Sequence, residues 1–144
     1  MGAVKEILGS LNLFLSYIIY TILYIQSTSF LRYTLPMKTF SEKVVELALS
    51  IPPGRAVTYG MLAHRAGGGA MASQSITTIL GKAYMAGQRN IPWHRIVYAG
   101  GRVWIDEQHF AGRMNLYKKE KITIIDKNGK YFIQDFDEVV WDFK

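Results

Sequence analysis

Cysteine is absent from the 144 residues of this chain. Its absence excludes disulfides, thiolate metal ligands and thiol nucleophiles, and it fits a reducing compartment. Charge is also sparse: 19% of the residues are charged and 49% are hydrophobic, which argues against global disorder. A chain of this length has room for one domain with a hydrophobic core.

Charged residues are missing from positions 7–31, where Leu11 to Ile25 form an almost continuous apolar run. Such a run is long enough to cross a bilayer as a helix, and the greater number of Lys and Arg after it would leave the rest of the chain in the cytoplasm. Two other interpretations stay open. The segment is a buried or partner-facing helix, or residues 1–36 are an extension before a domain of residues 37–144 that starts at Met37.

Acidic residues are missing between Glu46 and Asp106. A segment with charge of one sign attracts a polyanion such as DNA, although an ordinary solvated basic surface has the same composition. The basic residues of this segment are Arg55, Arg65, Lys82, Arg89, Arg95 and Arg102.

Apolar spacing predicts three helices in the first half of the domain. The first covers about 40–48 and is capped by Thr39 or Ser41, and the second begins after Thr58 as its N-cap. Gly67 to Gly69 then separate it from a helix over about 72–86. Two helices joined by a short glycine turn are typical of a helix-turn-helix.

Short β-rich runs dominate the chain after Pro92. Residues 96–98 and 102–104 predict a hairpin or wing closed by Ala99 to Gly101, and a helix is expected over about 108–120. Two more strands, 122–125 and 131–133, flank a turn at Asn128-Gly129. The predicted fold is therefore α+β, a small winged helix-turn-helix domain preceded by an apolar N-terminal helix.

Residues suited to catalysis or metal binding are few. The three histidines, His64, His94 and His109, lack the spacing of zinc ligands, and no paired carboxylates lie near the basic segment. Gly67 to Gly69 are not followed by the Lys-Ser/Thr pair of a phosphate-binding loop. We therefore expect no metal, no cofactor and no enzymatic activity.

Two motifs carry more information together than either does alone: residues 53–60, PGRAVTYG, and residues 92–97, PWHRIV. With a helix-turn-helix between them, they resemble the DNA-binding domain of the O6-alkylguanine-DNA alkyltransferases, and most of all the cysteine-free alkyltransferase-like proteins. The resemblance covers about Thr39 to Ile125.

The resemblance implies that an alkylated guanine is flipped out of the duplex into a pocket. The family's alkyl-accepting cysteine is replaced here by Trp93, whose indole cannot accept an alkyl group by that route. An indole instead offers a flat apolar wall for a base or an alkyl group, unless Trp93 is simply a core aromatic.

Other roles follow from the resemblance by position. Tyr59 matches the tyrosine that helps to rotate the target nucleotide, and Glu120 matches the glutamate that is linked to the motif histidine through a water. His94 and Glu120 are expected to act mainly as scaffold, and Arg95 as a structural or phosphate contact. The residues expected to form the lesion pocket are Tyr59, Pro92, Trp93, His94, Arg95, Tyr98, Ala99, Gly100 and Gly101.

One position departs from the family. Ser73 stands where the family carries an arginine that replaces the flipped base, so Gln74 is the alternative side chain for that role. Arg65 is a further candidate to compensate. The expected DNA contacts are Arg55, Thr58, Arg65, Ser73, Gln74, Ser75, Thr77, Lys82, Arg89 and Arg102.

The leading hypothesis is a non-enzymatic sensor of alkylated double-stranded DNA that marks lesions for nucleotide excision repair proteins. It would act in the cytoplasm at the nucleoid, or at the inner membrane if residues 7–31 make a membrane contact. A second hypothesis is a winged-helix DNA-binding regulator without lesion specificity, with or without a membrane tether. A third is hydrolysis with His94 as the base.

Overall fold

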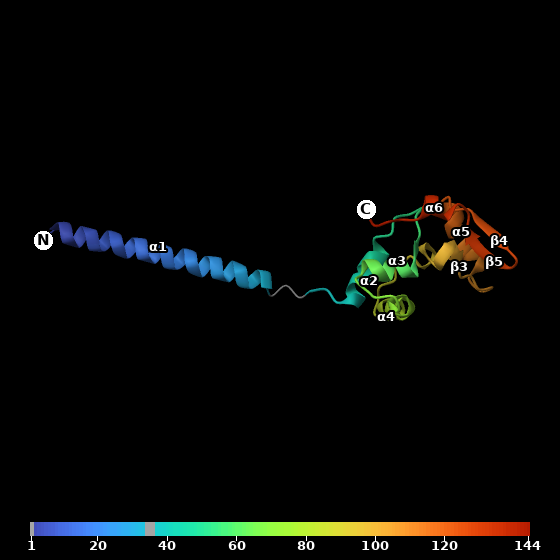
Figure 1. Cartoon of the computed structure of the whole chain (residues 1–144), viewed down its shortest axis with the longest axis horizontal. Helices are drawn as coiled ribbons and strands as arrows, with labels where there is room; N and C mark the ends of the chain where they lie inside the picture. Colours follow the sequence, from blue (N-terminus) through green and yellow to red (C-terminus); the bar gives the residue numbers. More distant parts are fainter. Residues whose placement is uncertain (1, 34–36) are drawn as a thin grey trace. The chain divides into compact units, whose positions relative to one another are not determined.

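The computed structural model of the chain describes residues 2–33 and 37–144. These belong to two compact units, Met1–Met37 and Lys38–Lys144 (Figure 1). The first contains one helix, α1 (Gly2–Tyr33), whose segment Gly2–Ile25 is long and apolar enough to cross a membrane, with a mean hydropathy of 1.6. The membrane contact predicted for 7–31 includes side chains at 26–31 that lie outside the described residues.

Two predicted N-caps are confirmed in the second unit. Helix α2 (Phe40–Leu49) begins with a capping box in which Glu42 N donates to Thr39 Oγ1 at 3.3 Å and Thr39 N donates to Glu42 Oε2 at 2.7 Å. Helix α3 (Tyr59–Arg65) is capped by Thr58, whose Oγ1 accepts from Met61 N at 3.1 Å. The helix starts are therefore fixed by local hydrogen bonds.

The glycine turn after α3 is closed by two backbone hydrogen bonds of 2.9 Å, from Gly67 N to His64 O and from Gly68 N to Ala63 O. Gly67 has a φ of +91°, which suits glycine. A Cβ on Gly68 would lie 2.5 Å from the Ala72 Cβ and 2.8 Å from the Phe40 ring. The turn is therefore packed tightly against its neighbours.

The helix predicted over 72–86 consists of two parts. The 3-10 helix η1 (Ala72–Ser75) comes first and the α-helix α4 (Ile76–Met85) follows it. Helices α2, α3 and α4 pack around one apolar core, and the predicted helix-turn-helix is present. Its fully buried side chains include Val44, Ala48, Leu62, Ile76 and Leu80.

The predicted hairpin around Ala99 to Gly101 is wrong. Strand β2 (Ile96–Val97) pairs in parallel with β1 (Val57–Thr58), whereas β3 (Arg102–Val103) pairs with β5 (Lys130–Ile133) in a different sheet. The 3-10 helix η3 (Ala99–Gly101) connects the two sheets. Strands β2 and β3 have only two residues each. The local turn links them through a hydrogen bond from Tyr98 N to Arg102 O at 2.9 Å, but their strand partners are distant in the sequence.

The second sheet has the order β3-β5-β4 and is antiparallel. The predicted turn between β4 (Ile124–Lys127) and β5 is confirmed, because Asn128 and Gly129 have the positive φ values of 55° and 75° that such a turn requires. Figure 1 shows β3, β4 and β5 beside α5 (Phe110–Lys119). The fold is α+β, a winged helix-turn-helix, as predicted.

The C-terminal segment returns to the start of the helix-turn-helix. After the short helix α6 (Phe136–Val139), Val140 forms a parallel bridge with Ala56, and Trp141 N donates to Ala56 O at 2.9 Å. Trp141 and Phe143 then pack against the helical core. The end of the chain is therefore part of the domain's core.

Candidate binding pocket and nucleic-acid interface

A hollow of about 600 Å³ opens between α3, α4 and α5. The 3-10 helix η2 (Trp93–Arg95) forms part of its wall, as do residues 98, 104 and 109. Aromatic side chains are its main component. The lining residues are Tyr59, Thr77, Tyr84, Ile91, Trp93, His94, Tyr98, Trp104, His109, Arg113 and Leu116.

Two of the aromatic walls of this pocket extend from the carboxyl end of the parallel β1–β2 pair. Tyr59 follows β1 and Tyr98 follows β2, and their ring centroids lie 5.3 Å apart with an interplanar angle of 51°. Trp93 is half-buried because it also packs against the helical core. Flat apolar faces of this kind can stack on a planar aromatic ligand such as a nucleobase.

Two of the predicted DNA-contacting arginines stack on tyrosines that line the pocket. The Arg102 guanidinium lies 4.2 Å from the Tyr98 ring centroid, and that of Arg89 lies 4.3 Å from the Tyr84 ring centroid. These cation–π contacts leave the guanidinium charge without a carboxylate partner among the described residues. They therefore place positive charge beside two of the aromatic side chains that line the pocket.

The Glu120 carboxylate ties the two sequence motifs together. It accepts from Arg95 Nη2 at 2.6 Å, from His94 Nε2 at 2.8 Å and, in the first motif, from Gly54 N at 3.0 Å. Its side chain is 9% exposed. Arg95 Nη1 also donates to Ile51 O at 2.7 Å, so all five residues form one largely buried network.

This network determines the protonation of His94 and Glu120. Burial alone would raise the pKa of the Glu120 carboxyl, but hydrogen bonds from Arg95, His94 and Gly54 outweigh burial and lower the pKa to about 2. Burial lowers the pKa of His94, although Glu120 alone would raise it. Burial outweighs Glu120 and keeps the pKa of His94 below its usual value, so the imidazole is neutral at pH 7 and donates to the carboxylate through Nε2.

We expect acid to destabilise the domain through both groups. Their folded-state pKa values lie below the unfolded ones, so unfolding takes up protons and the free energy of unfolding falls as the pH falls. The His94 contribution is lost below about pH 6.5, and that of Glu120 between about pH 4.3 and 2. Urea unfolding from pH 8 to 3 measures this loss. In Glu120→Gln, the free energy of unfolding should fall less steeply with pH below about pH 4.3. A fall as steep as in the wild type would show that Glu120 does not contribute to the acid sensitivity.

Four residues predicted for the lesion pocket line the hollow: Tyr59, Trp93, His94 and Tyr98. Five others do not. Pro92 is buried and Arg95 turns toward Glu120. Ala99 and Gly100 are exposed to solvent. Gly101 packs against Phe136, whose Cγ would lie 2.8 Å from a Cβ added at this glycine. Gly101 is thus required both by its φ of +76° and by this packing.

The predicted DNA contacts divide between several environments. Thr77 lines the pocket, and Thr58 caps α3. Arg55 Nη1 donates to Glu138 O at 2.6 Å, and Arg65 lies 6.0 Å from the Phe143 ring centroid. Ser73 is half-buried, whereas Gln74, Ser75 and Lys82 are exposed.

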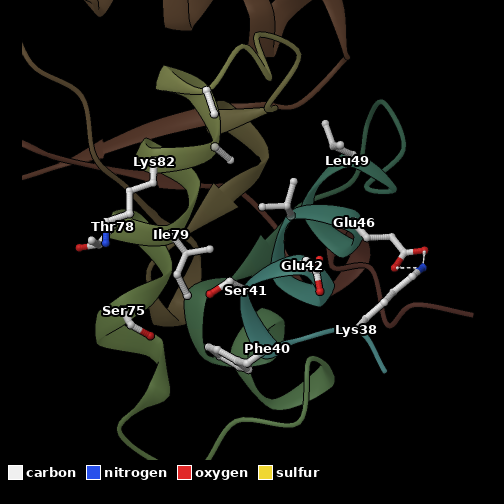
Figure 2. A pocket seen from close by; sticks show the side chains of 13 residues that line it. Lys38, Phe40, Ser41, Glu42, Glu46, Leu49, Ser75, Thr78, Ile79 and Lys82 are labelled. Carbon is white, nitrogen blue, oxygen red and sulfur yellow. Dashed lines mark hydrogen bonds and ion pairs between the residues drawn. The ribbon is translucent and has the colours of Figure 1, made fainter. Parts of the chain in front are cut away.

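A larger hollow of about 1050 Å³ lies between α2 and α4 (Figure 2). Ser75 lines it from η1, Thr78 and Lys82 from α4, and Phe40 and Leu49 from α2. Its lining residues are of mixed character although the surface they present is mainly apolar, and the Lys38–Glu46 ion pair of 2.7 Å lies at its edge. Helical spacing puts Lys82 on a different face of α4 from Thr77, so the two predicted DNA contacts do not share one surface.

Six pocket residues were not predicted from the sequence: Tyr84, Ile91, Trp104, His109, Arg113 and Leu116. Trp104 is 54% exposed just after a strand, and an exposed tryptophan is a signal that could have identified it. Tyr84 and Arg113 come from α4 and α5, whose mutual approach no local pattern reveals.

A family model described as "6-O-methylguanine DNA methyltransferase, DNA binding domain" matches residues 39–122. The chain belongs to this family. The match includes both motifs, Glu120 and the entire lining of the aromatic pocket. This chain has no cysteine, and Trp93 lies in its second motif.

Two solved structures share the family fold. The structure of S. pombe Atl1 in complex with damaged DNA containing O6-carboxymethylguanine is 21% identical, with a TM-score of 0.58. That of S. pombe ATL in complex with DNA is 22% identical, with a TM-score of 0.54. Each match covers 73% of this chain and 98% of the other. No curated protein matches the sequence.

Proposed function

We propose that this chain binds duplex DNA containing an O6-alkylguanine and holds the flipped base in the aromatic pocket without removing the alkyl group. The observation that carries the proposal is the pocket itself, walled by Tyr59, Trp93 and Tyr98. Its volume of about 600 Å³ lies within the range of small-ligand sites. Its stacked arginines, Arg89 and Arg102, suit the phosphates on either side of the base.

The chemistry of the pocket favours binding without transfer. The chain has no thiol, and Trp93 occupies the motif position of the family's nucleophile. Glu120 accepts hydrogen bonds from His94, Arg95 and Gly54. This network supports the pocket wall and leaves no activated nucleophile beside a bound base.

Titration of two duplexes tests the proposal, one with a single O6-methylguanine and one with guanine at the same position. Fluorescence anisotropy should show tighter binding to the lesion duplex, and both affinities should fall steeply with salt because Lys and Arg contact phosphates. The DNA should keep its methyl group after prolonged incubation, as measured by mass spectrometry. Equal affinities would refute lesion recognition, and loss of the methyl group would refute binding without transfer.

The bound complex would then present the lesion to nucleotide excision repair proteins, a role that rests on the family resemblance. Helix α1 supports a second element of the proposal, anchorage to the inner membrane with the DNA-binding unit in the cytoplasm. Sedimentation with membranes after a high-salt wash would support anchorage. Complete release into the soluble fraction would refute it.

A further inference from the structure

The turn that leads into η1 presents one large apolar side chain, Met71, to solvent. Met71 is 69% exposed and follows Gly69 and Ala70, which have little or no side chain. It is the N-cap residue of η1, and its carbonyl accepts from Gln74 N at 3.2 Å. The Met71 side chain therefore projects from the start of the helix pair that the fold uses to approach DNA.

The backbone beneath Met71 is held firmly. The two 2.9 Å hydrogen bonds at Gly67 and Gly68 close the turn, and Gly68 packs against Phe40 and Ala72. A rigid support matters because a side chain that enters a base stack must resist being pushed back. The exposed methionine is thus presented by an ordered turn.

The neighbouring side chains suit this role less well. Ser73, at the family's arginine position, is short and half-buried. The Ser75 hydroxyl donates to Ala72 O at 2.7 Å and is engaged with its own turn. No charged residue lies between Arg65 and Lys82 in the sequence, so the segment that begins this helix supplies no cation of its own.

We propose that Met71 is an apolar wedge that enters the base stack and fills the space left by the flipped nucleotide. Methionine is among the side chains that proteins insert between base steps, where they unstack the bases and kink the duplex. The inference deepens the proposed function and rests on it. It assigns to Met71, rather than to Ser73 or Gln74, the positioning role that the family gives to an arginine.

The test uses the full chain and a duplex with O6-methylguanine opposite pyrrolocytosine, a fluorescent base that brightens when it loses its partner. The wild type should bind the lesion duplex more tightly than the unmodified one and should brighten the probe. Met71→Ala should lower the lesion preference by about tenfold and reduce the brightening at saturating protein. Its affinity for the unmodified duplex should stay within about twofold of wild type, because the wedge acts only on the flipped state.

Three variants separate a wedge from a general surface effect. Met71→Leu should keep the brightening, because leucine is also a wedge residue. Gln74→Ala should keep it as well. Met85→Ala removes another highly exposed methionine (77%), at the C-terminal end of α4, and should leave both duplex affinities unchanged.

Each outcome discriminates between the two proposals. Lesion preference and brightening that survive in Met71→Ala, or that are lost in Gln74→Ala instead, would overturn the wedge and leave lesion binding intact. A wild-type chain with neither lesion preference nor brightening would overturn the proposed function, and the wedge with it.

Discussion

Replacing Glu120 with leucine should lower the free energy of unfolding by about 3–5 kcal/mol, the cost of leaving a buried charge without its partner. The substitution removes the acceptor of Arg95, whose side chain is only 16% exposed. It also leaves the donors His94 Nε2 and Gly54 N unpaired in a largely buried site. Urea unfolding of the full chain measures the loss through tryptophan fluorescence, since all three tryptophans lie in the second unit.

The chain supplies a matched control. The Lys38–Glu46 ion pair has nearly the same length, 2.7 Å against 2.6 Å for Arg95–Glu120, but both its side chains are 58% exposed. Glu46→Leu should therefore cost no more than about 1 kcal/mol. Similar losses in the two variants would show that the Glu120 network contributes no more than a surface ion pair.

Trp93→Ala should weaken binding of O6-methylguanine duplex by about 10- to 100-fold, because stacking of a base on an aromatic side chain contributes ~1–3 kcal/mol. The affinity for unmodified duplex should change little, since Trp93 lines the pocket and the proposed phosphate contacts, Arg89 and Arg102, stack on other residues of its lining. Anisotropy titrations with both duplexes measure the two effects separately.

Trp93 also packs against the helical core, so loss of stability must be separated from loss of stacking. Trp93→Leu keeps apolar volume against the core but removes the flat face, and it should lose lesion affinity while retaining a cooperative unfolding transition. Trp93→Phe should keep part of the affinity. An equal weakening for both duplexes in Trp93→Leu would contradict the pocket-wall role.

Features determined within a few residues were predictable from the sequence. Thr39 and Thr58 cap the helices that they precede, and Asn128-Gly129 forms the expected turn. In each case the physical cause is local, a side-chain hydrogen bond to the next helical turn or a backbone that tolerates positive φ. The family motifs also made it possible to predict that the aromatic residues Tyr59 and Trp93 line a pocket.

Features determined by long-range contacts were not predictable. Arg95 was expected at the pocket or as a structural or phosphate contact, and its hydrogen bonds to Glu120, 25 residues away, give it the structural role outside the pocket lining. The residues around Ala99 look like a hairpin, yet Ile96 and Arg102 find partners in separate sheets. Tyr84 and Arg113 reach the pocket from different helices. Local periodicity contains no information on which distant elements meet.

The bridge between Ala56 and Val140 bears on where the independently folding module ends. Residues 39–122 carry the family's recognisable pattern, yet Trp141 and Phe143 cover the helical core, and Ala56 N donates to Val139 O at 3.1 Å. Strand β5 likewise supplies the partner of β3. A fragment of residues 39–122 would contain every residue of the aromatic pocket. It would lack strand β5 and the aromatic side chains Trp141 and Phe143, which support the sheet and the helical core. The segment that matches the family model is thus shorter than the segment whose contacts make up the folded domain.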